Sequence, residues 1–339
     1  MRNPRRMLAG ALVALSLLAA CAGGGGGGGA SASSAGPSVQ LSLVAYSTPQ
    51  EAYDKIIAAF RKTPAGRNVT FTTSYGSSGD QSRAVQSGLA ADVVAFSLEP
   101  DMTRLVTAGL VDPSWNADAL KGMITDSVVV FVVRKGNPKH ITTWSDLVRP
   151  GVEVINPNPF TSGGARWNVM AAYGQAVAGG RPESDGTAYL NALYKNVPVQ
   201  DNSARQALQT FTSGKGDVML AYENEAIFAQ QHGQAVDYVV PDSTILIENP
   251  VAVTKASKNP EQAKAFLDYL HSAAAQEIFA AGGYRPVVEG TKVPKPFPTP
   301  KGLFAIGQFG GWSEVTKKFF DPTTGIMAGV ERGIGVSVG

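Results

Sequence analysis

The sequence predicts an α/β fold divided into two lobes, each with a largely parallel sheet flanked by helices. One unit recurs along the chain, in which a short apolar strand leads through a loop of small residues into a helix. The roughly 300 residues that follow the N-terminal segment are more than a single core normally holds. A long apolar segment, Ser127–Pro138, separates the first three units from the later ones.

The recurring unit occurs six times. Apolar residues alternate or run together in its first part and recur at three- and four-residue spacing in its last part, as in a strand followed by a helix. The units span Val39–Lys62, Asn68–Leu89, Ala91–Leu110, Gly151–Val177, Val197–Gly214 and Asp217–Gly233. Such alternation favours parallel strands joined by helices. Ligands of such proteins bind beyond the carboxyl ends of the strands, so these loops are the predicted binding region.

Two long apolar segments, Ser127–Pro138 and Thr244–Thr254, are expected to cross between the lobes. This division places residues 39–127 and 249–284 in the first lobe and residues 128–248 and 285–339 in the second. The returning piece of the first lobe is predicted to carry one helix over Asn259–Gly283. The ligand cleft is then expected between the lobes.

The N-terminal segment has the pattern of an export signal. Residues 1–20 combine three arginines with an uncharged apolar run from Met7 to Ala20, which is too short to span a bilayer comfortably. The run ends in Leu18-Ala19-Ala20-Cys21, which is similar to the lipobox of bacterial lipoproteins. That resemblance implies cleavage before Cys21 and a lipid on its thiol; the alternative is an ordinary signal peptide with an incidental cysteine.

Residues 21–38 read as a flexible tether, because seven consecutive glycines and then Ser/Ala-rich residues follow Cys21. The signal, the cysteine and the tether together predict a folded body outside the cytoplasmic membrane and anchored to it. Cys21 is the only cysteine of the chain, so it contributes no internal disulfide.

Composition argues against several classes of function. The 29 Lys and Arg nearly balance the 27 Asp and Glu, and no basic tract suggests a nucleic-acid partner. Three isolated histidines and one cysteine give poor support for a transition-metal site, and no cofactor is expected. The segment GSSGDQS lacks the lysine of a phosphate-binding loop. No G-x-S-x-G motif occurs, so we expect a binding protein and not an enzyme.

Three loops carry the residues that a neutral anion site requires. Ser162-Gly163-Gly164, Gly76–Gly79 and Asn202-Ser203-Ala204 all precede predicted helices. The first N–H groups of a helix lack intrahelical partners, and the helix dipole is positive there, so an anion binds without a charged side chain. Glycine permits close approach to the backbone, and serine adds a hydroxyl donor. Each loop alone can be a simple helix cap, but their joint occurrence favours an oxyanion site.

Several segments resemble the periplasmic sulfate-binding proteins of bacterial ABC importers. They are VRKGNPK, DLVRPGVEVINPNPFTSGGARWN, KNVPVQDNSAR, GDVMLAYENEA, YRPV and FGGW, and the likeness runs from about Val39 to Phe320. The resemblance implies the two-lobed type II periplasmic-binding-protein fold, which closes over a dehydrated sulfate held by uncharged donors. It also implies delivery of sulfate to a membrane-embedded ABC permease with its ATPase.

Matching the family motif position by position assigns seven sulfate-binding residues. The resemblance implies hydroxyl donors at Ser78 and Ser162 and backbone N–H donors at three further positions, Gly163, Gly164 and Ala204. Ser47 replaces the usual aspartate of the family, whose contribution is also a backbone N–H. Tyr222 replaces the usual tryptophan, and a phenol differs from an indole in reach and in being able to accept a hydrogen bond.

Arg166 and Arg205 follow the binding backbone groups closely. The resemblance implies that these arginines do not touch sulfate but donate hydrogen bonds to loop carbonyls and pair with carboxylates. The alternative is that both side chains lie on solvent-exposed helix faces. Four nearby carboxylates are expected to face solvent or arginines, namely Asp80, Asp201, Glu223 and Glu225.

Selectivity depends on the balance of donors and acceptors. Sulfate carries no proton at neutral pH, whereas hydrogen phosphate has an O–H that needs an acceptor, so a donor-only pocket favours sulfate. A carboxylate inside the pocket would favour phosphate. Thiosulfate, molybdate and tungstate remain open as ligands. Two hypotheses from different classes also stay open: an exported hydrolase or transferase of sulfated or phosphorylated substrates, and a surface adhesion protein.

Overall fold

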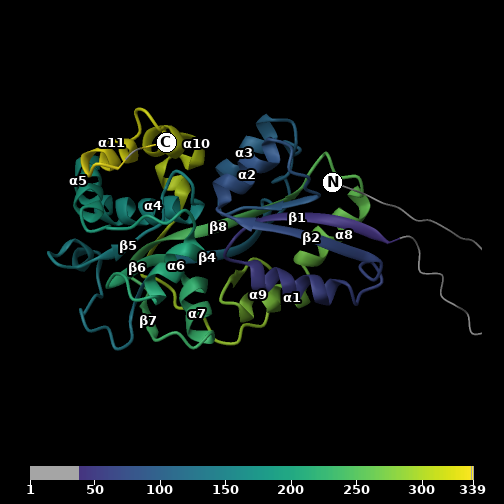
Figure 1. The fold of residues 1–339 in the computed structure, drawn as a ribbon, viewed down its shortest axis with the longest axis horizontal. Helices are drawn as coiled ribbons and strands as arrows, with labels where there is room; N and C mark the ends of the chain where they lie inside the picture. Colours follow the sequence, from purple (N-terminus) through teal and green to yellow (C-terminus); the bar gives the residue numbers. More distant parts are fainter. Residues whose placement is uncertain (1–37, 337, 339) are drawn as a thin grey trace, which may run out of the picture. The chain divides into compact units, whose positions relative to one another are not determined.

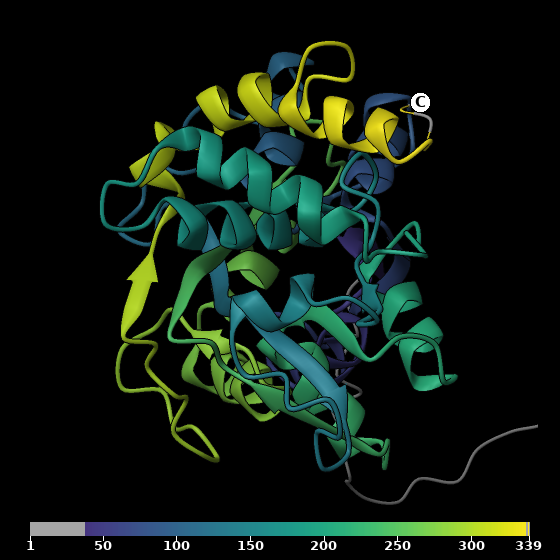
Figure 2. The same ribbon diagram turned by 90° about the vertical axis from the view of Figure 1, so that its left-hand side faces the viewer.

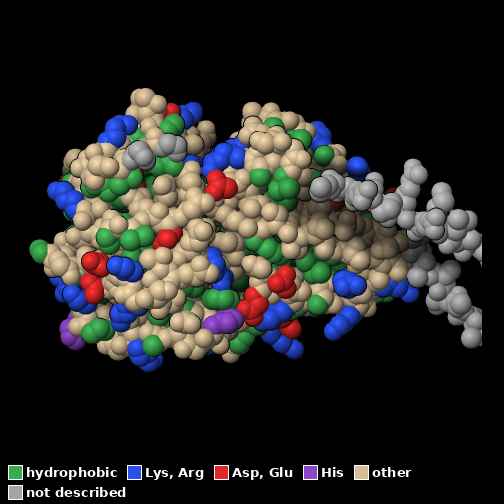
Figure 3. All heavy atoms as spheres, viewed as in Figure 1, with side chains coloured by type: hydrophobic (Ala, Val, Ile, Leu, Met, Phe, Trp, Pro, Cys, Tyr) green, Lys and Arg blue, Asp and Glu red, His purple; other side chains and the backbone are tan. Residues whose placement is uncertain are grey.

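The computed structural model describes residues 38–336 and residue 338. The predicted signal peptide, Cys21 and nearly all of the tether lie outside the described residues. Among the residues that are described, no helix is long and apolar enough to cross a membrane. Figure 3 shows positive and negative side chains interspersed over one face of the body.

The first lobe is built on a parallel sheet in which the central strand β1 pairs with both β2 and β3. Side chains of β1 alternate between two cores: Leu41, Leu43 and Ala45 pack on one face and Val44 on the other. In Figure 1, α1 and α9 cover one face, and α2 and α3 cover the opposite face. The elements are β1 (Val39–Tyr46), α1 (Gln50–Phe60), β2 (Val69–Gly76), α2 (Ser78–Gln86), β3 (Val93–Ala95), α3 (Glu99–Thr107), α8 (Pro260–Leu270) and α9 (Ala273–Ala281).

The second lobe contains its own sheet with helices on both faces. Strands β5 and β6 pair in parallel, and β4 pairs antiparallel with β6 and β7. Its elements are β4 (Met123–Arg134), η1 (Trp144–Val148), β5 (Val154–Ile155), α4 (Gly163–Val177), α5 (Glu183–Tyr194), α6 (Ala204–Thr212), β6 (Val218–Tyr222), α7 (Glu223–Gln231) and β7 (Val236–Val239). Its two cores lie on opposite faces, with α4 and α5 in one and α6 and α7 in the other.

The C-terminal segment packs on the second lobe. Its elements are β9 (Arg285–Pro286), β10 (Gly302–Phe304), η2 (Ile306–Phe309), α10 (Gly311–Phe320) and α11 (Ile326–Gly333). Trp312, Phe319 and Met327 are buried in the same core as α4 and α5. Figure 2 shows α10 and α11, in yellow, lying over the teal helices α4 and α5.

Two long strands connect the lobes. Strand β4 and strand β8 (Ser243–Val253) pair antiparallel between Met123/Pro250 and Val128/Leu246. The end of β8 continues into the first sheet beside β3, and the end of β4 continues into the second sheet beside β6. The strands that end at the predicted loops are therefore held in one framework of strand pairing.

Two predicted elements are wrong. The single helix over Asn259–Gly283 is interrupted, because α8 ends at Leu270 and the Ser272 hydroxyl caps a new helix by accepting the Ala275 N–H at 3.3 Å. The strand expected at the start of Val197–Gly214 is reduced to one isolated bridge at Val199. The neighbouring Pro198 has no N–H to donate to a strand ladder.

A pair of carboxylates lies on the connecting strands. Asp126 of β4 and Glu248 of β8 are directly paired residues. Burial and the neighbouring Glu248 carboxylate raise the pKa of Asp126 to about 7, although Arg285 acts in the opposite direction. Ionisation of Asp126 therefore opposes folding.

Asp126→Asn is expected to reduce the pH dependence of the free energy of unfolding. The pKa of Asp126 is about 7 in the folded protein and about 4 in the unfolded chain. Its contribution to the free energy of unfolding is therefore fully present below pH 4 and is lost as the pH rises toward about 7. With allowance for solvent screening, the variant should exceed the parent in stability by about 1–2 kcal/mol near pH 8, and by little near pH 4. Denaturant unfolding at both pH values measures this. An equal difference at both pH values would contradict it.

Candidate anion-binding site

A small pocket lies where loops of the two lobes meet. The residues around it come from the ends of β1, β2, β3 and β6 and from the beginnings of α2, α4 and α6. None of the lining residues is Asp, Glu, Lys, Arg or His. They are Tyr46, Ser47, Thr48, Gly76, Ser77, Ser78, Ser97, Ser162, Gly163, Gly164, Ser203, Ala204 and Tyr222, and they include all seven residues assigned from the sequence.

Helix beginnings supply N–H groups to this pocket. Helix α4 begins at Gly163, and its N-cap Ser162 accepts the Ala165 N–H through Oγ at 3.4 Å. Helix α6 begins at Ala204, behind the N-cap Ser203. The first N–H groups of each helix have no intrahelical acceptor and lie at the positive end of the helix dipole. The arrangement therefore presents donors and partial positive charge without an ionised group.

Ser78 begins α2, and its hydroxyl is engaged behind the pocket. Its Oγ donates to Asp101 Oδ2 at 2.6 Å and accepts the Ser97 N–H at 2.9 Å. Asp101 is in turn paired with Arg104 at 2.9 Å. The hydroxyl proton expected to serve an anion is therefore given to Asp101, which leaves the backbone N–H of Ser78 as its donor at this helix beginning.

Tyr222 ends β6 and caps α7. Its hydroxyl lies 2.6 Å from Ser97 Oγ, on the loop after β3 in the first lobe. Burial raises the pKa of Tyr222 well above its usual range, so the phenol stays neutral. The tyrosine thus reaches across the cleft to another pocket hydroxyl.

Six residues line the pocket besides the seven assigned ones. Gly76, Ser77 and Ser203 belong to loops that were predicted to form the anion site, whereas Tyr46, Thr48 and Ser97 were missed. Ser97 follows β3, just as Ser47 follows β1, so its place at a strand end was a usable signal. Tyr46 gave no such signal, because it ends an apolar strand; among the described residues its buried hydroxyl has no hydrogen-bond partner.

Arg205 fastens the pocket loops from outside the pocket. Its Nη2 donates to the Thr48 carbonyl at 2.7 Å and to Glu225 Oε1 at 2.8 Å. Its guanidinium also lies 3.6 Å from the ring centroid of Phe228. Because Thr48 is in the first lobe and Arg205 in the second, this side chain joins the two sides of the cleft.

Arg166 holds the loop that precedes α4. Its Nε donates to the Pro159 carbonyl at 2.8 Å, and its guanidinium lies 4.9 Å from the ring centroid of Phe320. Arg166 does not line the pocket.

The four nearby carboxylates stay out of the pocket lining. Asp80 pairs with Arg83 at 2.5 Å, Glu223 with Arg285 at 2.9 Å and Glu225 with Arg205 at 2.8 Å. Asp201 differs from the expectation, since it accepts the Thr210 hydroxyl at 3.0 Å. Among the described residues, no cluster of three or more His, Cys, Asp or Glu suits a metal ion.

The lobes touch along the pocket. The Gly79 N–H donates to the Thr161 carbonyl at 3.1 Å, and Asn202 Nδ2 donates to Asp80 at 2.8 Å. A Cβ on Gly163 would lie 2.4 Å from Leu98 Cδ2 and 2.7 Å from Ser97 Oγ, so any larger residue would force these side chains of the first lobe to move. The structure therefore shows a closed cleft.

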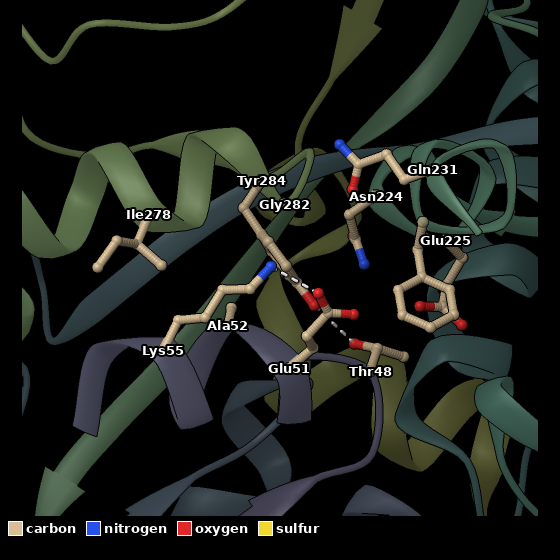
Figure 4. A pocket seen from close by; sticks show the side chains of 11 residues that line it. Thr48, Glu51, Ala52, Lys55, Asn224, Glu225, Gln231, Ile278, Gly282 and Tyr284 are labelled. Atoms are coloured by element: carbon tan, nitrogen blue, oxygen red, sulfur yellow. Dashed lines mark hydrogen bonds and ion pairs between the residues drawn. The ribbon is translucent and has the colours of Figure 1, made fainter. Parts of the chain in front are cut away.

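A second pocket differs sharply in chemistry. It lies between α1, α7 and α9, and Figure 4 shows Glu51, Lys55 and Glu225 among its lining side chains. Glu51 pairs with Lys55 and lies 3.1 Å from His232 Nε2. Thr48 is the one residue that it shares with the neutral pocket.

The sequence matches a known family of bacterial binding proteins. The family model described as "Bacterial extracellular solute-binding protein" matches residues 41–285. The chain therefore belongs to the bacterial extracellular solute-binding proteins, and it has their two-lobed type II fold.

Particular relatives are similar over most of the chain. A sulfate-binding protein of Synechococcus elongatus is 42% identical, over 84% of this chain and 85% of that protein. The sulfate-binding protein of Escherichia coli is 39% identical, over 83% and 90%. A thiosulfate-binding protein of Pseudomonas aeruginosa is 34% identical, over 82% and 88%.

Among solved structures, the sulfate-binding protein SubI from Mycobacterium tuberculosis is 44% identical, with a TM-score of 0.81 over 84% of this chain and 100% of that chain. A periplasmic thiamin-binding protein has a TM-score of 0.68 over 88% of this chain and 96% of that chain. At 17% identity the second likeness concerns the fold alone.

Arg205→Met is expected to destabilise the protein in a pH-dependent way. Burial raises the pKa of Glu225 while Arg205 acts in the opposite direction, so loss of Arg205 leaves a buried unpaired carboxylate. Breaking such a pair costs about 3–5 kcal/mol. A raised folded pKa means that the cost is smallest in acid and grows as the pH rises through that pKa.

Denaturant unfolding over a pH series measures this cost, and Arg205→Met combined with Glu225→Gln is the matched control. The double variant should recover much of the lost stability near neutral pH. A loss that is the same at every pH and in both variants would refute the buried-charge explanation.

Proposed function

We propose that this chain is an extracytoplasmic solute receptor that captures sulfate in the neutral pocket and delivers it to an ABC import permease. The observation that carries the proposal is a pocket at several helix beginnings that is lined by hydroxyl and backbone groups and by no ionised side chain. Relatives named sulfate-binding proteins, at 39–42% identity over most of the chain, support the choice of anion.

The proposed donors come from both lobes. Backbone N–H groups of Ser47 and Ser78 serve the anion from the first lobe, and those of Gly163, Gly164 and Ala204 serve it from the second. The Ser162 hydroxyl accepts the Ala165 N–H, so its own proton remains free for a sulfate oxygen. Tyr222 also belongs to the second-lobe side of the site, and its hydroxyl lies 2.6 Å from Ser97 Oγ. Each such bond to a charged ligand contributes about 1.5–3 kcal/mol.

Arg166 and Arg205 are proposed to hold the binding loops in place without contacting the anion. Each donates to a loop carbonyl, at Pro159 and at Thr48, and each lies outside the pocket. They orient the backbone that meets the anion without contributing a charge to it.

Delivery is proposed to depend on lobe closure. The lobes comprise residues 39–127 with 249–284, and residues 128–248 with 285–339. Strands β4 and β8 connect them, and the anion binds the closed arrangement better because only then do both sets of donors reach it. The closed form is the one that the permease recognises, and no covalent chemistry is performed.

Calorimetric titration with sulfate, thiosulfate, phosphate, molybdate and tungstate tests this function. We expect one sulfate per protein, with hydrogen phosphate weaker because its O–H meets donors, at a cost of about 1–3 kcal/mol. Ser162→Ala should weaken sulfate binding by about 1.5–3 kcal/mol. Tight phosphate binding without sulfate binding would overturn the proposal. Turnover of a sulfated or phosphorylated substrate without capture of free anion would instead indicate an enzyme.

The receptor is proposed to be anchored through a lipid on Cys21, after removal of residues 1–20. The lipobox-like sequence and the glycine-rich segment support this proposal. Cys21→Ser should move the protein from the membrane fraction to the soluble extracytoplasmic fraction while sulfate affinity stays unchanged. Retention of the Cys21→Ser protein in the membrane fraction would contradict the lipid anchor.

A further inference from the structure

Ser97 occupies a special position in the pocket. It follows β3, it is one of the residues that line the pocket, and only 1% of its surface is exposed. A Cβ on Gly163 of the opposite lobe would lie 2.7 Å from Ser97 Oγ. The closed cleft therefore brings the first turn of α4 directly onto the Ser97 side chain.

Hydrogen bonds fix the Ser97 backbone on both sides. Its carbonyl accepts from Trp167 Nε1 at 2.8 Å and from Asn249 Nδ2 at 3.0 Å, which uses both lone pairs. Its N–H donates to Ser78 Oγ at 2.9 Å, and Ser78 donates onward to Asp101. These partners come from α4, β8 and α2, so closure and strand pairing together hold this residue in place.

The Ser97 and Tyr222 hydroxyls, 2.6 Å apart, share one hydrogen bond and have two protons. Besides Ser97 Oγ, the Tyr222 hydroxyl has one protein acceptor within hydrogen-bond distance among the described residues, the Ser97 carbonyl oxygen at 3.4 Å. That oxygen already accepts two shorter hydrogen bonds, from Trp167 and Asn249. The Tyr222 proton is therefore best placed on Ser97 Oγ. This leaves the Ser97 proton free to point into the pocket.

We propose that Ser97 donates its hydroxyl proton directly to the bound oxyanion and that Tyr222 is a positioning residue that orients this hydroxyl from the opposite lobe. This inference rests on the proposed function and deepens it. The Tyr222–Ser97 bond joins the two lobes, so the donor is oriented only when the cleft is closed. The phenol thereby serves the anion through the serine and not by direct contact.

Calorimetric titration of the folded protein with sulfate tests which of the two hydroxyls, Ser97 or Tyr222, donates directly to the anion. Ser97→Ala should weaken sulfate binding roughly 10- to 100-fold, because it removes a donor to a charged ligand. Tyr222→Phe should weaken it less, by roughly 3- to 10-fold, because the Ser97 hydroxyl remains but is free to rotate. The double variant should match Ser97→Ala within about threefold, because both changes act on one interaction.

Ser82→Ala is the matched control. The Ser82 hydroxyl is buried and donates to the Asp101 carbonyl at 2.6 Å, outside the pocket lining. We expect its sulfate affinity to stay within about twofold of the parent. Melting temperatures without sulfate check that each variant folds, and the rise in melting temperature at a fixed sulfate concentration gives a second measure of binding.

The outcomes separate this inference from the proposed function. A parent that binds sulfate and a Ser97→Ala variant that binds it equally well would overturn the role of Ser97 alone. A larger loss in Tyr222→Phe than in Ser97→Ala would reverse the order and make Tyr222 the direct donor. A parent that binds no sulfate would overturn the proposed function together with this inference.

Discussion

Burial of an anion without a cation is the constraint on which the proposed site depends. An ion removed from water is stable only when hydrogen bonds replace its hydration. Helix beginnings provide such donors at fixed positions, and the neutral pocket lies at three of them, in α2, α4 and α6. Helix α2 follows β2 of the first sheet and α4 follows β5 of the second, so the strand framework and the closed cleft are both needed to bring the helix beginnings together.

The same constraint explains where the ionised side chains lie. Asp101 with Arg104, Glu225 with Arg205 and Glu223 with Arg285 form ion pairs outside the pocket lining. A buried pair of this kind contributes little net stability, but breaking it is costly, so it holds loops in one geometry. Arg205 shows this directly, because the guanidinium that neutralises Glu225 also holds the Thr48 carbonyl of the opposite lobe.

Local chemistry in the sequence was enough to predict most of the strand–loop–helix units and three of the loops that meet in the pocket. Ser47 and Tyr222 were assigned only through the family resemblance. Ser162-Gly163-Gly164 was recognisable because a serine and two glycines at a helix beginning leave backbone N–H groups accessible to an anion. The partner of each hydroxyl was not predictable, since Ser78 bonds to Asp101 of α3 and Tyr222 bonds to Ser97, 125 residues away. The break at Ser272 was missed because apolar spacing continues across it, while the cap depends on one hydroxyl.

A crystal structure of the sulfate complex tests the central claim most directly. The account predicts one sulfate in the neutral pocket, with its oxygens within about 3.2 Å of backbone N–H groups at the beginnings of α2, α4 and α6 and of serine hydroxyls. No Lys, Arg, Asp or Glu side chain should contact the anion. A sulfate bound by Arg205 or another charged side chain, or one seated in the pocket between α1, α7 and α9, would contradict it.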